Sequence, residues 1–349
     1  APAIIVDMKA AIRYMRHNAE SVPGDVEKII TNGTSAGGAL SALAGATGNA
    51  KEYEPYLKAI GAAEERDDIF AASCYCPIHN LEHADAAYEW LFQKEAVFHM
   101  MKFEMSPQGP KMVPVVGELS REQKELSAEL KAQFPAYVNS LGLTDEEGKK
   151  LTLDEHGEGS FKDYVMSYVL ASATKEKATR DSQNRLADLA VPGSGIDEQE
   201  YLAFTGDQAS GLDVDAYIAK ITRMKLTPAF DSLSLDSPEN EEFGDEQVMA
   251  RHFTDFALQH SKVKGDKADD QIIKLLNPTE FIGKCDTTKN WRIRHGAFDR
   301  DTSIAIPVIL ATLLKNKGYE VDFALPWGLP HSGDYDLEEL FRWIDRLAK

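Results

Sequence analysis

Apolar residues recur at helical and at strand spacing along the chain, and the alternation between the two is clearest near its beginning. Ile5, Met8, Ile12 and Met15 follow one another at helical intervals and predict an amphipathic helix. The first part of the pattern predicts, in order, a helix over 4–17, a strand over 28–31, a sharp turn over 32–35, a helix over 36–46, a buried strand over 69–76 and a helix around 86–90.

The middle of the chain has a different character. Residues 93–274 are highly charged, and their pattern predicts helices separated by polar loops, with no strand. Capping and periodicity predict helices beginning near Ser120, over 160–177, over 213–224 and over 246–260. We interpret this region as an inserted, mainly helical lid.

Strands and helices alternate again after Asn290. The pattern predicts a strand over 291–295, a helix over 302–316, a strand over 320–326 and a helix over 336–347. Strands alternating with helices indicate a parallel sheet covered on both faces. The expected fold class is therefore α/β, with core segments 1–92 and 276–349 separated by the lid, residues 93–275.

Charge and composition narrow the possible partners. The net charge of −19 argues against nucleic acid, whose phosphates are bound by clustered Lys and Arg. Apolar runs stay below the roughly 20 residues that span a bilayer, so we expect no membrane segment. Three cysteines make no disulfide framework, and we expect all to be reduced. The first residues do not resemble a signal peptide, and the sequence is compatible with a cytoplasmic or a secreted location.

A candidate nucleophile lies in the sequence GTSAG, residues 33–37. Ser35 follows a predicted strand and precedes a predicted helix, which is the setting of a nucleophile elbow. Gly33 and Gly37 are expected to permit the tight turn. The alternative is an ordinary turn serine.

An acid and a histidine follow in the order that such a serine requires. Asp299 comes just after the predicted strand 291–295, and His331 just after the strand 320–326. Parallel sheets bind ligands beyond the carboxyl ends of their strands. We therefore predict that Ser35, Asp299 and His331 form a catalytic triad.

The backbone N–H of Ala36, at the start of the helix, would supply half of an oxyanion hole. The other half usually comes from the loop after the third strand of such a sheet, and we expect this chain to begin after the fourth. The strand at 28–31 would then be an uncovered edge. We therefore expect an amino-terminal companion segment or chain of roughly 100 to 150 residues to complete the sheet.

The histidines of one loop raise a further possibility. His79, His83 and Asp85 have a spacing that could suit a metal ion on a helix. No Cys or Glu partner is arranged around them, and polar surface is the ordinary interpretation of such a group. We expect no metal site.

Several stretches resemble bacterial tannases over nearly the whole chain: NGTSAGG (32–38), CPIHNLEHADAAYEW (76–90), TPAFDSLSLDSPENEEFG (227–244), NWRIRHGAFDRDTS (290–303) and WGLPHSGDYD (327–336). The resemblance implies an α/β hydrolase with a large lid that cleaves galloyl esters, such as hydrolysable tannins and alkyl gallates. It also implies that no cofactor is used.

The same resemblance implies roles for residues that composition alone would place on the surface. Lys225, Glu239 and Asp301 match the positions that hold the gallate hydroxyls, and Ile78 and Pro238 match those that flank the ring. From the residues alone, Asp301 could instead cap the helix beginning at 302 or serve as the triad acid; the resemblance assigns that second role to Asp299.

Two other functions compete with this interpretation. A feruloyl or other hydroxycinnamoyl esterase would share the triad and differ in the ring pocket. A non-catalytic binding protein on an esterase scaffold would keep the fold without an active serine.

Overall fold

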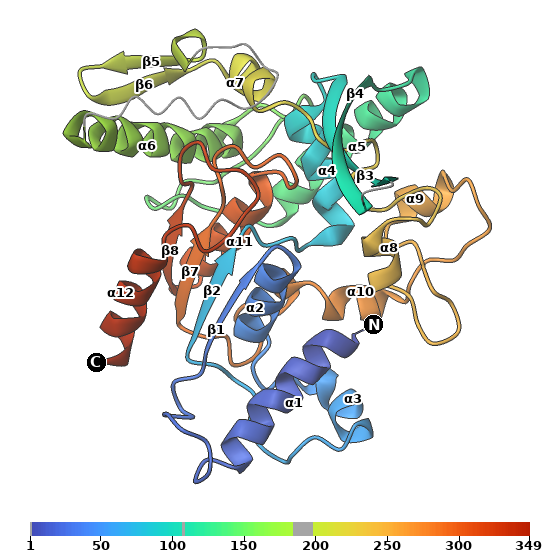
Figure 1. Cartoon of the computed structure of the whole chain (residues 1–349), viewed down its shortest axis with the longest axis vertical. Coiled ribbons are helices and arrows are strands. Elements are labelled where there is room, and N and C mark those ends of the chain that lie inside the picture. The colour runs from blue at the N-terminus through green and yellow to red at the C-terminus, as the bar shows by residue number, and fades with distance from the viewer. Residues whose placement is uncertain (1, 107–108, 184–197) are drawn as a thin grey trace.

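The computed structural model of the chain describes residues 2–106, 109–183 and 198–349, and its centre is a parallel sheet (Figure 1). The strands lie in the order β1 (Ile30–Thr34), β2 (Ala71–Tyr75), β7 (Asn290–Arg294) and β8 (Glu320–Ala324). Their register is level, since Thr34, Tyr75, Arg294 and Ala324 lie side by side. The residues that follow the strands therefore meet at one edge of the sheet.

Helices cover both faces of this sheet. Side chains alternate along β2: Ala71 and Tyr75 pack on α12 (Leu337–Ala348), whereas Ala72 and Cys74 belong to the main core with α2 (Ala36–Ala46) and α11 (Ala305–Asn316). Burial on both faces explains why β2, the one strand of this sheet that is buried at every position, has no alternation of apolar and polar residues.

The helices α1 (Ala3–His17), η1 (Lys51–Tyr53) and α3 (Glu54–Ala59) lie together at the end of the sheet opposite the lid (Figure 1). Their junction holds buried charges. Lys9 Nζ lies 2.7 Å from Asp67 Oδ1, and Arg13 Nη2 lies 2.7 Å from Asp67 Oδ2. The two cations offset the desolvation of one carboxylate and tie α1 to the loop before β2.

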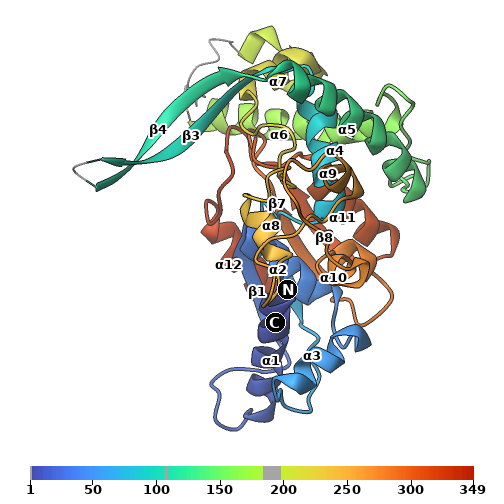
Figure 2. The same cartoon turned by 90° about the vertical axis from the view of Figure 1, so that its right-hand side faces the viewer.

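The segment between β2 and β7 forms the top of the molecule in Figure 1 and continues down its right-hand side. Its elements are α4 (Leu81–Phe92), β3 (Val97–Ser106), β4 (Gly109–Glu118), α5 (Arg121–Ser140), α6 (Ser160–Gln183), η2 (Glu198–Glu200), β5 (Leu202–Thr205), β6 (Gln208–Leu212), α7 (Val214–Ile221), α8 (Pro238–Glu242), α9 (Asp255–Gln259), α10 (Asp270–Leu275) and η3 (Pro278–Glu280). On the right-hand side of Figure 1 lie α8, α9 and α10. Figure 2 shows the β3–β4 hairpin extending away from the rest of the molecule.

Two antiparallel hairpins correct the expectation of a lid without strands. The pairs β3–β4 and β5–β6 were not predicted from the pattern. The β3–β4 hairpin exposes apolar side chains such as Met101, Met105 and Val116, and none of its described residues is fully buried, so apolar and polar residues do not alternate cleanly along it.

The helix expected over 246–260 is also wrong, because only α9 forms there. Thr254 caps α9 by accepting a hydrogen bond from the N–H of Ala257. Phe253 and Thr254 donate their backbone N–H groups to the buried carboxylate of Asp231, which holds them outside a helix. A distant side chain thus overrides local helical preference.

The remaining elements agree with the pattern within a few residues. Helix α2 is confirmed at its expected bounds, and α11 begins three residues later than expected. Strand β1 runs to Thr34 and so includes most of the stretch expected as a turn. All three cysteines are free thiols, as expected. Within the described residues, no helix combines the length and apolar character needed to cross a bilayer.

Candidate active site

Ser35 occupies a strained turn between β1 and α2. Its backbone has φ 61° and ψ −122°, a conformation that non-glycine residues rarely adopt. Its N–H donates to the carbonyl of Tyr75 at 2.9 Å. A Cβ at Gly33 would lie 2.1 Å from the carbonyl oxygen of Gly37, and one at Gly38 would lie 2.6 Å from that of Tyr75. Glycine is therefore needed at 33 and 38, whereas Gly37 has open space and the expectation for it was wrong.

The structure brings Ser35, His331 and Asp299 into one line. Ser35 Oγ lies 2.9 Å from His331 Nε2, and His331 Nδ1 lies 2.7 Å from Asp299 Oδ2. Asp299 Oδ1 accepts hydrogen bonds from the N–H groups of Asp301 at 2.8 Å and Thr302 at 3.3 Å. All three side chains follow the carboxyl ends of strands, as the sequence predicts.

The charges of this line are set by burial and contact. Burial alone would raise the pKa of Asp299, but the neighbouring imidazoles of His295 and His331, with backbone donors, lower it to about 2. Burial opposes the charged form of His331, yet its hydrogen bond to Asp299 and that carboxylate's charge raise its pKa above the ordinary 6.5. A fixed anion beside a basic imidazole is the arrangement that activates a serine hydroxyl.

The three charged residues expected around a ring meet next to this line. Lys225 Nζ lies 3.2 Å from Asp301 Oδ1 and 3.8 Å from the centre of the Phe230 ring. Burial raises the pKa of Glu239, the charge of Lys225 opposes that rise, and the charge of Asp301 adds to it. Asp301 does not cap a helix, because α11 begins at Ala305.

A buried ion pair that the sequence did not reveal positions Lys225. The Arg223 guanidinium pairs with Glu89 of α4, and both side chains are fully buried. Arg223 Nε also donates to the carbonyl of Lys225 at 2.7 Å. The hydroxyl of Tyr88 accepts from the N–H of Lys225 at 3.0 Å and donates to the carbonyl of Arg300 at 3.0 Å. The lysine's backbone is thus fixed to both the lid and the loop that carries Asp299.

A second unpredicted centre holds the segment that carries Glu239. The buried carboxylate of Asp231 accepts hydrogen bonds from Asn240 Nδ2 at 2.8 Å, from His252 Nδ1 at 2.7 Å and from Thr254 at 2.8 Å. Asn240 follows Glu239 directly, and Ser237 caps the same short helix, α8. No local spacing signals this convergence.

The other expected residues lie as follows. Ala36 is exposed and is the first residue of α2, where backbone N–H groups lack an intrahelical acceptor. Ile78 is partly buried against the main core, and its N–H lies 3.3 Å from the carbonyl of Ser35. Pro238 is exposed and is the first residue of α8.

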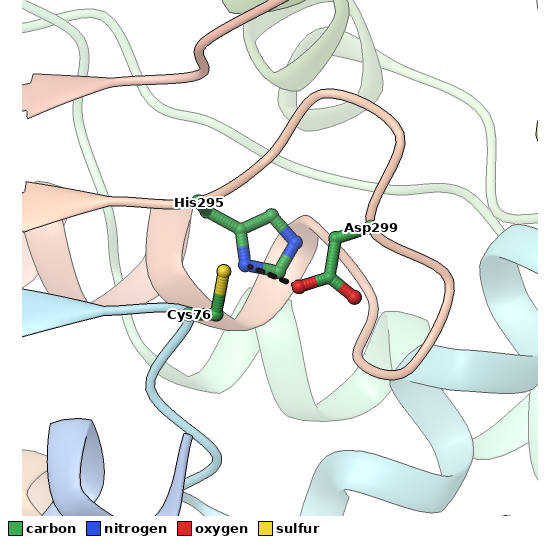
Figure 3. A group of neighbouring side chains, drawn as sticks. All are labelled: Cys76, His295 and Asp299. Atoms are coloured by element: carbon green, nitrogen blue, oxygen red, sulfur yellow. Dashed lines mark ion pairs between the residues drawn. The ribbon is translucent and has the colours of Figure 1, made fainter. Parts of the chain in front are cut away.

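Two of the three residues considered for a metal, His83 and Asp85, have other contacts, whereas His79 is buried without a hydrogen-bond partner. His83 stacks on Tyr137, with ring centres 3.5 Å apart, and Asp85 accepts hydrogen bonds from the N–H groups of Phe230 and Asp231. Within the described residues, the grouped metal-type donors are instead Cys76, His295 and Asp299, whose ligand atoms lie within 4.8 Å of one another (Figure 3).

Asp299 and Cys76 already have other hydrogen-bond partners. Asp299 Oδ2 contacts His331, and the Cys76 thiol donates to the carbonyl of Ser332 at 3.3 Å. Burial, followed by the charge of Asp299, raises the pKa of that thiol. Because these groups already contact one another and their neighbours, Cys76 and His295 are better placed to hold the Asp299 carboxylate than to bind a metal ion.

Comparison with known proteins places this geometry in context. The family model described as BD-FAE matches residues 1–88. Esterase LipQ of Mycobacterium tuberculosis is 33% identical over 90 residues, a stretch that is 26% of this chain and 20% of that protein.

Solved structures match the entire chain. The tannin acyl hydrolase of Lactobacillus plantarum is 51% identical with a TM-score of 0.89, and the match covers 100% of this chain and 72% of that one. The tannase of Fusobacterium nucleatum is 46% identical with a TM-score of 0.90, covering 100% and 73%. The expected α/β-hydrolase fold is confirmed.

Proposed function

The chain belongs to the tannase family, and on that premise we propose that it is a carboxylic ester hydrolase that cleaves galloyl esters of hydrolysable tannins and simple alkyl gallates. The observation that carries the proposal is the contact line from Ser35 Oγ through His331 to Asp299, at 2.9 and 2.7 Å. A tannin acyl hydrolase that is 51% identical to this chain was solved in complex with ethyl gallate, which supports the substrate class.

The proposed reaction proceeds through an acyl-enzyme. Ser35 Oγ attacks the ester carbonyl while His331 Nε2 takes its proton, and His331 then protonates the leaving alcohol. Asp299 keeps the Nδ1–H tautomer of His331 in place and stabilises the imidazolium. The N–H of Ala36 donates to the oxyanion at the positive end of α2. Water, activated by His331, then releases the acid and restores Ser35.

The charged side chains of Lys225, Glu239 and Asp301, beside the proposed triad, are proposed to recognise the ring. Phenolic hydroxyls donate to carboxylates and accept from an ammonium, so Glu239, Asp301 and Lys225 can together bind adjacent hydroxyls of one ring. Ile78 and Pro238 are proposed to flank its apolar faces. A site that pairs each hydroxyl discriminates against rings that lack them, because its own polar groups would stay unpaired.

The function is tested by comparing methyl gallate with methyl ferulate and methyl benzoate. We expect fastest hydrolysis of the gallate, and loss of at least about 10⁴-fold in Ser35→Ala. Faster turnover of the ferulate would instead support a hydroxycinnamoyl esterase. A folded protein whose Ser35 resists a fluorophosphonate would support a binding protein without catalysis.

We also propose that a further strand pairs with β1. This strand forms one edge of the described sheet, and beside it lies a groove of about 490 Å³ lined by apolar residues that include Met8, Ile12 and Ile30. An amino-terminal companion segment or chain would cover this edge. Amide exchange over 30–34 tests the idea: the companion should slow exchange there, and unchanged exchange in its presence would contradict pairing.

A further inference from the structure

A second imidazole lies directly behind the triad acid. His295 follows β7 and is fully buried, and its Nδ1 lies 3.5 Å from Asp299 Oδ2. Figure 3 shows its ring facing the carboxylate, with the sulfur of Cys76 beside it. His295 therefore faces the same oxygen that contacts His331.

Neither ring nitrogen of His295 has a hydrogen-bond partner. Buried polar groups are normally paired, and leaving one unpaired is costly. At 3.5 Å, Nδ1 is a few tenths of an ångström beyond an ordinary hydrogen bond to Asp299. Hydrogen bonds in active sites are often long without ligand and shorten when charge develops.

The surroundings determine how much charge His295 carries. Asp299 and Asp301 on its own loop favour protonation, as does the backbone of Thr302, and the charge of His331 from the next loop opposes it. His79, from the loop after β2, is also buried, and burial together with the neighbouring His295 lowers its pKa to about 3, so it is neutral near pH 7. Burial dominates and lowers the pKa of His295, so the ring is neutral near pH 7 and can donate one proton.

The two oxygens of Asp299 are fixed unequally. Oδ1 accepts from two backbone N–H groups, those of Asp301 and Thr302. Oδ2 contacts His331, which takes up and releases a proton in the proposed reaction. A second donor on Oδ2 would limit rotation of the carboxylate. His295 is placed to be that donor.

We propose that His295 is a positioning residue whose neutral Nδ1–H donates to Asp299 Oδ2, which keeps the carboxylate ionised and aimed at His331. The inference rests on the proposed serine-esterase function and adds a fourth side chain to its proton-handling line. The donor draws electron density from the carboxylate, so the carboxylate holds the proton on His331 less tightly than it would alone.

Removal of the His295 N–H should therefore lower kcat and raise the pH at which activity is lost on the acid side. In His295→Phe, which keeps a ring but no N–H, we expect kcat for methyl gallate to fall about tenfold or more while KM changes less than about twofold. The acid limb of kcat/KM against pH should move to higher pH, because His331 would bind its proton more tightly.

Two polar variants keep the test decisive if the phenylalanine protein does not fold. His295→Asn places an amide N–H near the position of Nδ1, and His295→Gln places it near that of Nε2. We expect asparagine to restore most of kcat and the wild-type acid limb, and glutamine to restore less. The matched control is His79→Phe, which removes an equally buried unpaired histidine, and its acid limb should not move.

The inference is overturned if the acid limbs of all His295 variants coincide with the wild type, or if asparagine does no better than glutamine. A loss of thermal stability with unchanged kinetics would show a space-filling role only. Ser35→Ala is measured in parallel. If it stays active, the esterase proposal itself fails; if it is inactive while His295→Phe behaves as wild type, only the role of His295 fails.

Discussion

Replacing Arg223 by methionine tests whether the lid's buried ion pair supports both stability and ring recognition. Arg223 and Glu89 are fully buried. The guanidinium also donates to Thr227 Oγ1 at 2.6 Å and to the carbonyl of Lys225 at 2.7 Å. Methionine fills similar space but leaves Glu89 buried without its counter-charge, which costs about 3 to 5 kcal/mol when one partner of such a pair is removed.

The kinetic consequence should be selective. Without Arg223, the carbonyl of Lys225 loses its donor, although Tyr88 still accepts from the lysine's N–H. Lys225 Nζ would then be less well fixed beside Asp301. We expect KM for methyl gallate to rise about tenfold, equivalent to about 1.4 kcal/mol, with little change for methyl benzoate, which has no hydroxyl to bind.

The assay combines urea unfolding with steady-state hydrolysis of both esters. The matched control is Arg342→Met, which removes an exposed arginine paired with Glu338 across one helical turn, at 66% and 91% side-chain exposure. Its unfolding free energy should change by less than about 0.5 kcal/mol. The reasoning is refuted if Arg223→Met and Arg342→Met unfold alike, or if the gallate-to-benzoate ratio of kcat/KM stays at the wild-type value.

Further predictions follow from the core. The pKa of His331 is raised above 6.5, so kcat/KM for methyl gallate should be full above that raised value and fall as pH drops through it; an acid midpoint below 6.5 would contradict this. Gly33→Ala should lower the melting temperature sharply, because its Cβ would lie 2.1 Å from a backbone oxygen, whereas Gly37→Ala meets nothing within 4 Å; equal melting temperatures would be inconsistent with the elbow described. Burial raises the pKa of Cys74 to about 12 and also that of Cys76, so both thiols should resist alkylation at pH 8 until urea is added, as mass spectrometry of the labelled peptides would reveal.

The parallel sheet and the grouping of Ser35, Asp299 and His331 could be predicted from the sequence, because both depend on short stretches of neighbouring residues. Each strand is short and is followed by a turn, and Ser35, Asp299 and His331 each come after the carboxyl end of such a strand. A level parallel register then brings strand ends together without further information. Order along the chain and position at strand ends were therefore sufficient to predict their proximity.

The positions of the residues proposed to bind the ring could not be predicted from local sequence patterns. Lys225 and Glu239 lie in a region whose local pattern suggested ordinary exposed charges, and they were singled out through family resemblance alone. Their placement depends on contacts between distant residues, such as Arg223 with Glu89, 134 positions apart. The hairpin β3–β4 was not predicted for a different reason. None of its described residues is fully buried, so apolar and polar residues do not alternate cleanly along its strands.

The lid and the acid loop are held together by contacts that make them act as one unit. Tyr217 of α7 donates to the carbonyl of Ala297, Arg300 donates to Thr222, and Lys225 pairs with Asp301. These contacts lie within a few residues of Asp299 on one side and of Lys225 on the other. A displacement of this part of the lid would therefore shift the triad acid together with the ring site. If the proposed function holds, a substrate that orders Lys225 would by these contacts also hold Asp299 in its position beside His331.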